Sequence, residues 1–223
     1  MKTHPKISEE KVGSIQSLRG LMVEVQIIGD RPEEKELLRV EDHPEVFLEV
    51  SFFKADTVVC INLTNSQVLQ CGQNIFRTHE KVSVPVGPNT LGRVFSALGE
   101  PLDEKPGITD KRRPISEASG TKSYRGTQKL EMLETGLKVI DFLTPFVKGR
   151  KIGIVGGAGV GKTVLTMEMI NNVTRNAKSL SIYCGVGERI REGNELYETL
   201  KETGVLKNTV MFFGQMVSTP AIR

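Results

Sequence analysis

The sequence predicts two structural units in tandem: a small all-β unit, a barrel or a sandwich, followed by an α/β unit built on a mostly parallel sheet. In the first 84 residues, turn residues separate short β-branched runs, whereas after Leu137 short apolar runs alternate with helical patterns. A length of 223 residues suits one large domain or two small ones. We expect the units to span residues 1–82 and 83–223.

Composition is that of an ordinary globular chain, with 38% apolar and 26% charged residues. No run of about 18 apolar residues is present, and the N-terminus lacks the pattern of a signal peptide. The net charge of +3 is too small for non-specific nucleic-acid binding. The three cysteines lack C-x-x-C spacing and the three histidines are scattered, which argues against disulfide scaffolds and zinc sites.

The all-β unit is predicted from short runs with turn residues between them. The turns are Gly29-Asp30-Arg31-Pro32, Asn65-Ser66 and Gly72-Gln73-Asn74, which reverse a chain at low conformational cost. The strands expected from these runs are Leu21–Ile28, Val46–Phe53, Thr57–Leu63 and Gln67–Cys71.

The stretch from Gly99 to Gly126 is rich in Gly, Pro and Ser and is predicted to be a loop. It contains Lys111-Arg112-Arg113, which we interpret as a solvated charged segment, with phosphate contact as the alternative. We assign these three residues no role.

The α/β unit is predicted from a change of period after Leu137. Its expected helices are Lys138–Phe146, Gly161–Thr174 and Glu192–Thr203, and its expected strands are Lys151–Val155, Leu180–Val186 and Thr209–Phe213. This β-α-β-α-β alternation indicates a parallel, doubly wound sheet. We expect Leu180–Val186 to lie beside Lys151–Val155.

A complete G-x-x-x-x-G-K-[ST] motif follows the run Lys151–Val155 directly: Gly156-Gly157-Ala158-Gly159-Val160-Gly161-Lys162-Thr163. Its glycines let successive backbone N–H groups point at an anion, and the following helix adds its N-terminal dipole. Lys162 is the expected partner of the β- and γ-phosphates, and the Thr163 hydroxyl is a suitable Mg²⁺ ligand. Val164 is a candidate contact for the base. The expected ligands are ATP or ADP with Mg²⁺.

Two charged residues follow the strand Leu180–Val186, within Gly187-Glu188-Arg189. Ligands bind at the carboxyl ends of strands in open α/β sheets. Glu188 is therefore a candidate general base that activates water, Arg189 a candidate γ-phosphate sensor, and Glu192 a candidate partner of a metal-bound water. The alternative is that Glu188 and Glu192 only favour the start of the next helix, with Arg189 paired to one of them. Residue chemistry alone leaves both open.

Further motifs surround these two. They are Val84-Pro85-Val86-Gly87, Thr90-Leu91-Gly92-Arg93, Leu98-Gly99-Glu100-Pro101-Leu102-Asp103, Leu133-Glu134-Thr135-Gly136-Leu137-Lys138-Val139-Ile140-Asp141, Arg191-Glu192-Gly193-Asn194-Glu195-Leu196-Tyr197 and Gly214-Gln215-Met216. Together with the phosphate loop and Gly187-Glu188-Arg189, they resemble the catalytic beta subunit of F-type rotary ATP synthases. The resemblance covers about Val82 to Met216; before Val82 it rests on the β pattern and Gly72-Gln73.

The resemblance implies an N-terminal β-barrel followed by a phosphate-loop nucleotide-binding domain that interconverts ADP plus phosphate and ATP. In that family, the residues matching Lys162 and Thr163 bind phosphate and Mg²⁺, the one matching Glu188 activates water, and the one matching Arg189 contacts the γ-phosphate. It further implies an alternating ring with alpha-type subunits, a central rotor stalk, a membrane ion-translocating sector and a place on the cytoplasmic or equivalent inner face of an energy-transducing membrane. We expect no nucleic-acid partner.

Two departures from the family pattern qualify this expectation. The family's Asn-Glu-Pro-Pro-Gly-Ala type of segment is replaced by Val217-Ser218-Thr219-Pro220-Ala221-Ile222-Arg223. The sequence also ends before the family's Walker B aspartate, aromatic adenine pocket and C-terminal helical domain, so we expect the 223-residue chain alone not to hydrolyse ATP. The alternative functions are a protein-export or RNA-translocating ring ATPase and a non-catalytic nucleotide-binding ring subunit.

Overall fold

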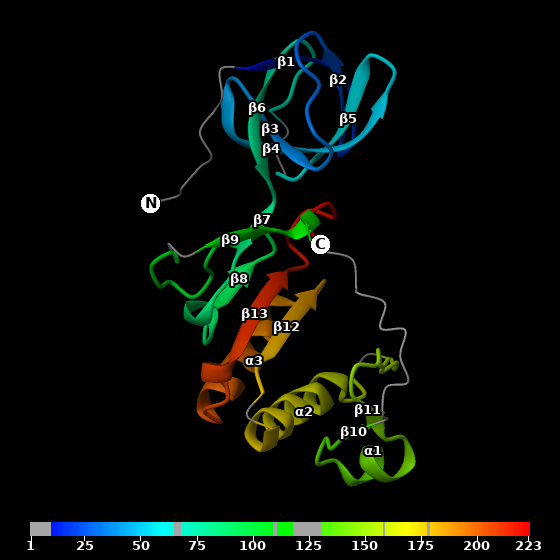
Figure 1. Ribbon diagram of the computed structural model, residues 1–223, viewed down its shortest axis with the longest axis vertical. Helices are drawn as coiled ribbons and strands as arrows, with labels where there is room; N and C mark the ends of the chain where they lie inside the picture. Colours follow the sequence, from blue (N-terminus) through cyan, green and yellow to red (C-terminus); the bar gives the residue numbers. More distant parts are fainter. Residues whose placement is uncertain (1–9, 65–67, 109–110, 118–130, 158, 178) are drawn as a thin grey trace.

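The computed structural model describes residues 10–64, 68–108, 111–117, 131–157, 159–177 and 179–223. In these residues a closed β-barrel leads through short strands into an α/β unit (Figure 1). The predicted fold class is confirmed. Among the described residues, no helix has both the length and the hydropathy that crossing a bilayer requires.

The barrel consists of six antiparallel strands in the order β1-β2-β5-β4-β3-β6. Their bounds are β1 Lys11–Arg19, β2 Met22–Ile27, β3 Glu36–Val40, β4 His43–Lys54, β5 Thr57–Asn62 and β6 Asn74–Lys81. Register shifts occur in several ladders, for example between Val50 and Phe52 of β4. Such bulges bend strands and help a sheet to close into a barrel.

Small β-branched side chains fill the barrel. Along β2, Val23 and Val25 are fully buried while Glu24 between them is not, which is the period-2 alternation of a strand with one face in a core. The buried cluster comprises Val12, Ile15, Val23, Val25, Leu38, Val40, Val46, Leu48, Val50, Val58, Cys60 and Ile75. Valine suits this position because its restricted χ1 and branched shape pack well on a pleated surface.

One strand predicted for the barrel is absent and another takes its place. Residues 68–71 contain no strand, and residue 67 lies outside the described part of the chain. Instead, β6 closes the barrel by pairing with both β1 and β3. Most of β6 is polar, so its hydrophobic pattern gives little signal. Strands β1 and β3 are likewise additional to the four predicted.

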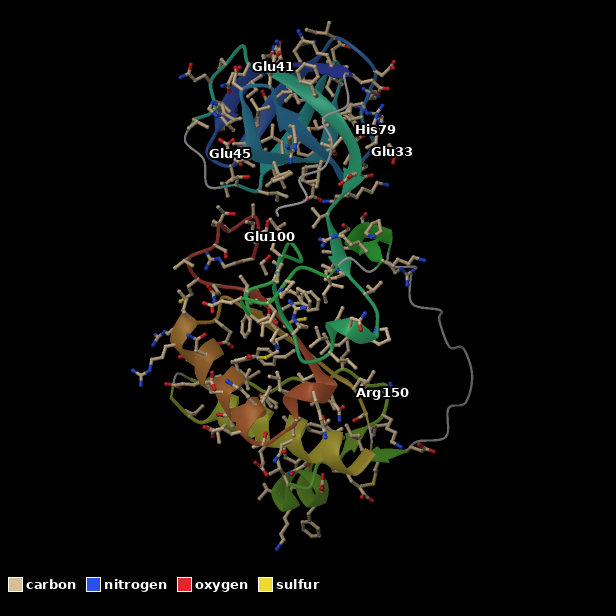
Figure 2. The ribbon with its side chains drawn as sticks, turned by 90° about the vertical axis from the view of Figure 1, so that its left-hand side faces the viewer. Glu33, Glu41, Glu45, His79, Glu100 and Arg150 are labelled. Carbon is tan, nitrogen blue, oxygen red and sulfur yellow. The ribbon has the colours of Figure 1, made fainter. Side chains whose placement is uncertain are left out.

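A buried ion pair joins β6 to β3. The Glu36 carboxylate is only 2% exposed and accepts two hydrogen bonds from the Arg77 guanidinium, at 3.0 and 2.8 Å, and one each from the backbone N–H groups of Glu33 and His79. Glu33 and His79 lie side by side at the edge of the barrel (Figure 2). Burial by itself raises the pKa of Glu36, but these four hydrogen bonds outweigh it and hold the pKa below its ordinary value.

In the segment after the barrel, a second arginine, Arg112, links separate stretches of backbone through its side chain. Strand β7, Ser83–Pro85, pairs with β9, Arg112–Pro114. The Arg112 guanidinium donates to the carbonyl oxygens of Ser83, Leu98 and Gly99. Arg112 and Arg113 belong to strand β9, so the prediction of a loop is wrong for these two residues, whereas both side chains are exposed, as predicted for a solvated segment. Short 3₁₀ turns occur at Pro88–Thr90 and Ile115–Glu117.

The α/β unit is built on three parallel strands in the order β12-β13-β8. They are β8 Val94–Ser96, β12 Ser181–Val186 and β13 Thr209–Gly214. Helix α2, Lys162–Ala177, and helix α3, Ile190–Glu202, pack against each other, and the 3₁₀ turn Leu206–Asn208 precedes β13. Their shared core is Val94, Leu196, Leu200, Val205, Leu206, Met211 and Phe213. The predicted parallel sheet and both of these helices are confirmed.

A short segment of two paired strands and one helix precedes the phosphate loop. Strands β10, Met132–Leu133, and β11, Phe146–Val147, pair beside helix α1, Lys138–Leu143, which ends three residues before the predicted Phe146. Asp141 accepts hydrogen bonds from the backbone N–H and hydroxyl of Thr135 and from the N–H of Gly136. These contacts hold the pKa of Asp141 below its ordinary value and fix the turn that leads into α1.

The predicted strand Lys151–Val155 is not formed. Its apolar side chains are exposed, Val155 to 98%, and β12 pairs with β13 and not with this segment. The prediction that Leu180–Val186 lies beside it is therefore wrong. A short apolar run indicates a segment that could form a buried strand. It does not show which other strand would pair with that segment.

The buried ion pair predicts how barrel stability depends on pH. Because the pKa of Glu36 is lower in the folded state, the stabilisation that it provides is complete above its ordinary value of 4.5 and is lost as the pH falls through the folded value. Glu36→Gln should reduce the free energy of unfolding by about 3 kcal/mol at pH 7, since Arg77 loses its buried partner.

The measurement is urea unfolding of both proteins between pH 7 and pH 3, where the difference should shrink. Glu45→Gln is the matched control, because Glu45 is exposed and its ion pair with His43 lies at the surface, where such pairs contribute little to stability. A difference between wild type and Glu36→Gln that stays constant down to pH 3 would contradict the assignment.

Candidate functional site

The phosphate loop leads directly into helix α2, whose first residue is Lys162. Gly159 and Gly161 have φ angles of 74° and 83°, which only glycine adopts without strain. The Lys162 ammonium donates to the carbonyl oxygens of Gly156, at 2.9 Å, and Gly157. Ala158, a predicted member of the loop, lies outside the described residues. The lysine charge is thus held over the loop by weak neutral acceptors that an anionic ligand can replace.

The remaining residues of the loop are accessible. Val160 and Val164 are exposed, and Thr163, on the first turn of α2, is half-buried. Backbone N–H groups at the start of a helix have no intrahelical acceptor, so the start of α2 favours an anion. The phosphate cradle stays a prediction, and the exposed Val164 is free to contact a planar group.

The second candidate group follows β12 at a tight turn. Gly187 has a φ of 70°, and its N–H donates to the Gly214 carbonyl at the end of β13. The Glu188 carbonyl accepts from the Met216 N–H at 3.1 Å, and Arg189 is the N-cap residue of α3. Two backbone hydrogen bonds from the following strand and loop therefore hold Glu188 at the carboxyl end of the sheet.

Glu188 lies in a setting that favours proton uptake. Burial is the main cause that raises its pKa, and a hydrogen bond and the negative charge of Glu192 raise it further. A hydrogen bond from the Tyr183 hydroxyl to Glu188 Oε1, at 3.2 Å, acts in the opposite direction. A carboxylate with a raised pKa is a better general base near neutral pH than an exposed one.

The charged neighbours of Glu188 are more exposed. The Arg189 Nε atom lies 3.9 Å from Glu192 Oε1, and the two side chains are 71% and 43% exposed. This contact matches the alternative in which Glu192 favours the first turn of α3 and Arg189 pairs with it. An exposed pair of this kind contributes little to stability, so Arg189 remains available for a charged ligand.

The structure groups the predicted residues into two sets. Lys162 and Thr163 begin α2, whereas Glu188, Arg189 and Glu192 surround the start of α3. Within the described ranges, no hydrogen bond or ion pair joins the two sets. Figure 1 shows α2 running from the phosphate loop back toward the start of β12. Lys151–Val155 forms no strand, so the residues before the phosphate loop do not pair with the sheet at whose edge Glu188 lies.

Sequence reasoning missed three residues that shape the Glu188 side of the site. They are Tyr183, Gly185 and Phe213. A Cβ on Gly185 would lie 2.7 Å from the Phe213 ring and 3.0 Å from Glu188 Cγ, so only glycine leaves room for both side chains. The available signal was a glycine inside an apolar strand, which often marks a close approach.

The described residues contain no group of three or more His, Cys, Asp or Glu side chains arranged to hold a metal ion. The Thr163 hydroxyl, at the start of α2, is an oxygen of the kind that Mg²⁺ accepts as a ligand.

The fold and the glycine-rich loop before α2 define the second unit as a phosphate-loop nucleotide-binding domain. Comparison with known families agrees: residues 136–223 match the model of the ATP synthase alpha/beta family, nucleotide-binding domain. The family model covers alpha and beta subunits together and does not separate them.

The close approach at Gly185 yields a test of the site's packing. Gly185→Ala should lower the free energy of unfolding by about 1–3 kcal/mol, because the Phe213 ring is buried and the new methyl group must displace it or Glu188. Chemical denaturation provides the measurement. Gly107→Ala is the control, since its new methyl group meets no atom within 4 Å. Equal stability of the two variants would rule out the packing described.

Proposed function

We propose that this chain is the catalytic, beta-type subunit of a rotary ATP synthase or ATPase, which interconverts ADP plus phosphate and ATP. Residues 1–82 form its barrel domain and residues 83–223 belong to its nucleotide-binding domain. The observation that carries the proposal is Glu188, a carboxylate with a raised pKa at the carboxyl end of a strand in a nucleotide-binding domain.

In this proposal the loop from Gly156 to Val164 binds the nucleotide. Lys162 leaves its two carbonyl acceptors and pairs with the β- and γ-phosphates. Thr163 would hold Mg²⁺ through its hydroxyl and Glu192 would hold it through a water, and the ion would supply positive charge to the phosphates. Glu188 accepts a proton from the attacking water, and Arg189 contacts the γ-phosphate.

The partners proposed follow from the family. The chain alternates in a ring with alpha-type subunits, encloses a rotor stalk and is coupled through it to transmembrane ion flow, on the cytoplasmic or equivalent inner face of the membrane. The 3.9 Å separation and high exposure of Arg189 and Glu192 fit a site that is completed by further charged groups. No role in nucleic-acid binding is proposed.

A second candidate is a non-catalytic nucleotide-binding subunit of the same ring. It is favoured by a match that does not separate alpha from beta subunits. The two candidates differ in what Glu188 does: a catalytic subunit needs its carboxylate for turnover, whereas a non-catalytic one needs it only for packing. Substitution of Glu188 in the assembled enzyme therefore decides between them.

Lys162→Ala should lower ATP hydrolysis by the assembled enzyme by at least ~100-fold, because it removes a preorganised charge partner of the phosphates. Phosphate release under steady-state conditions measures the loss. Lys201→Ala on α3 is the control, since Lys201 is exposed and faces Glu198. Turnover close to that of the control would show that the loop does not bind the reacting phosphates.

Glu188→Gln keeps the size and hydrogen bonding of the side chain but removes the proton acceptor. We expect nucleotide affinity to change less than about threefold while hydrolysis falls by ~100-fold or more. Glu198→Gln, an exposed substitution on α3, is the control. Unchanged hydrolysis in Glu188→Gln would favour the non-catalytic subunit, and equal losses of binding and turnover would favour a helix-start role.

A further inference from the structure

Tyr183 contacts Glu188 from the middle of strand β12. Its hydroxyl donates to Glu188 Oε1 at 3.2 Å, across five positions of sequence that include the turn at Gly187. The Tyr183 side chain is half-buried, so the protein partly shields this hydrogen bond from water. The Tyr183 hydroxyl is thus a neutral donor in direct contact with the Glu188 carboxylate.

The fold leaves the Tyr183 ring little freedom. The ring packs against Phe213 of the neighbouring strand, with centroids 5.8 Å apart and planes inclined at 54°. The parallel ladder sets Tyr183 opposite Met211 and Gly185 opposite Phe213. Because Gly185 has no side chain, Phe213 and the Glu188 side chain both approach its Cα. The position of the hydroxyl is therefore determined by strand pairing and ring packing.

The hydroxyl is a permanent donor at neutral pH. Burial is the main cause that raises the pKa of Tyr183 to about 12, and the charges of Glu188, Glu192 and Cys184 and the hydrogen bond to Glu188 add to it. Of the interactions that set the pKa of Glu188, the hydrogen bond from Tyr183 is the one that favours the ionised form, whereas burial and Glu192 favour the protonated form.

We propose that Tyr183 is a positioning residue for Glu188, orienting its carboxylate through the hydroxyl group and keeping one carboxylate oxygen occupied while the other faces the reacting water. The inference rests on the proposed role of Glu188 as the base. It assigns Tyr183 no contact with the nucleotide. A neutral donor suits this task, because a cationic partner would hold the carboxylate proton-free and make it a weaker base.

The first test separates positioning from binding. In the assembled enzyme, Tyr183→Phe should lower kcat about tenfold, since the carboxylate loses a hydrogen bond to a charged group, while KM stays within about twofold. Phenylalanine keeps the ring that packs on Phe213, so the unfolding midpoint should not change. Tyr197→Phe is the matched control, because Tyr197 packs against the same apolar cluster and its ring faces Lys201.

The combination with Glu188→Gln shows whether the two residues act together. In that background Tyr183→Phe should cause no further loss of kcat. If Glu188→Gln abolishes hydrolysis but Tyr183→Phe leaves kcat within twofold of wild type, the positioning role is overturned and the proposed function stands. If Glu188→Gln retains wild-type hydrolysis, the proposed function itself fails.

A spectroscopic test of the contact does not depend on turnover. The chain has no tryptophan and three tyrosines, so its near-ultraviolet spectrum is dominated by tyrosine. A hydroxyl that donates to a carboxylate absorbs at longer wavelength than one that donates to a neutral group. Glu188→Gln in the 223-residue chain should therefore give a tyrosine difference spectrum at neutral pH. That spectrum should vanish when Tyr183→Phe is also present, and its absence in Glu188→Gln alone would overturn the contact and the inference with it.

Discussion

The parallel pairing of β12 with β13 is the interaction on which the candidate site depends. The ladder runs from the pair Ser181 and Thr209 to the pair Val186 and Gly214. It sets the Phe213 ring against the Tyr183 ring, and against the positions where Gly185 and Gly193 lack a side chain. The buried Phe213 ring thus restricts the positions of strand β12, which precedes Glu188, and of helix α3, which follows it. A shift of one residue in this register would turn each side chain of β12 to the other face.

The residues at the end of β13 and just after it also contact the backbone around Glu188 and the barrel. Gly214 and Met216 bind the backbone of Gly187 and Glu188. A few residues later, the buried hydroxyl of Thr219 donates to the Leu63 carbonyl at 3.1 Å, in the segment that follows barrel strand β5. Thr219 belongs to the segment that departs from the family pattern. The stretch from Gly214 to Thr219 therefore contacts the loop that carries Glu188, through Met216, and the barrel, through Thr219, and it connects the two units.

The elements that could be predicted from the sequence are those that a local hydrophobic pattern marks. Helices α2 and α3 and strands β12 and β13 lie within a few residues of their predicted bounds, because an apolar period marks each of them. Strands β6 and β9 were missed because polar side chains dominate them and their partners are distant in sequence. Arg77 binds Glu36, and Arg112 binds the Ser83 and Gly99 carbonyls. Such pairings leave no periodic signal.

The candidate site likewise has a part that could be predicted from the sequence and a part that could not. The residue types of the phosphate loop and of Glu188 could be predicted, since each motif is contiguous. The support for Glu188 could not, because the contact between Gly185 and Phe213 exists only once β12 and β13 pair. The prediction of a strand at Lys151–Val155 failed for a related reason. The apolar run is present, but whether such a run pairs with another strand depends on the rest of the sheet, which periodicity does not reveal.

Two partly or fully buried carboxylates show how the same side chain serves opposite purposes in this chain. Glu36 is surrounded by a guanidinium and two backbone N–H groups, which outweigh its burial and keep it ionised. Glu188 is half-buried beside a second carboxyl group and receives one neutral donor, so the effect of burial prevails and its pKa rises. The first arrangement stabilises the barrel and makes a poor base. The second gives up that stabilisation and leaves a carboxylate able to accept a proton, which is the property that a water-activating residue requires.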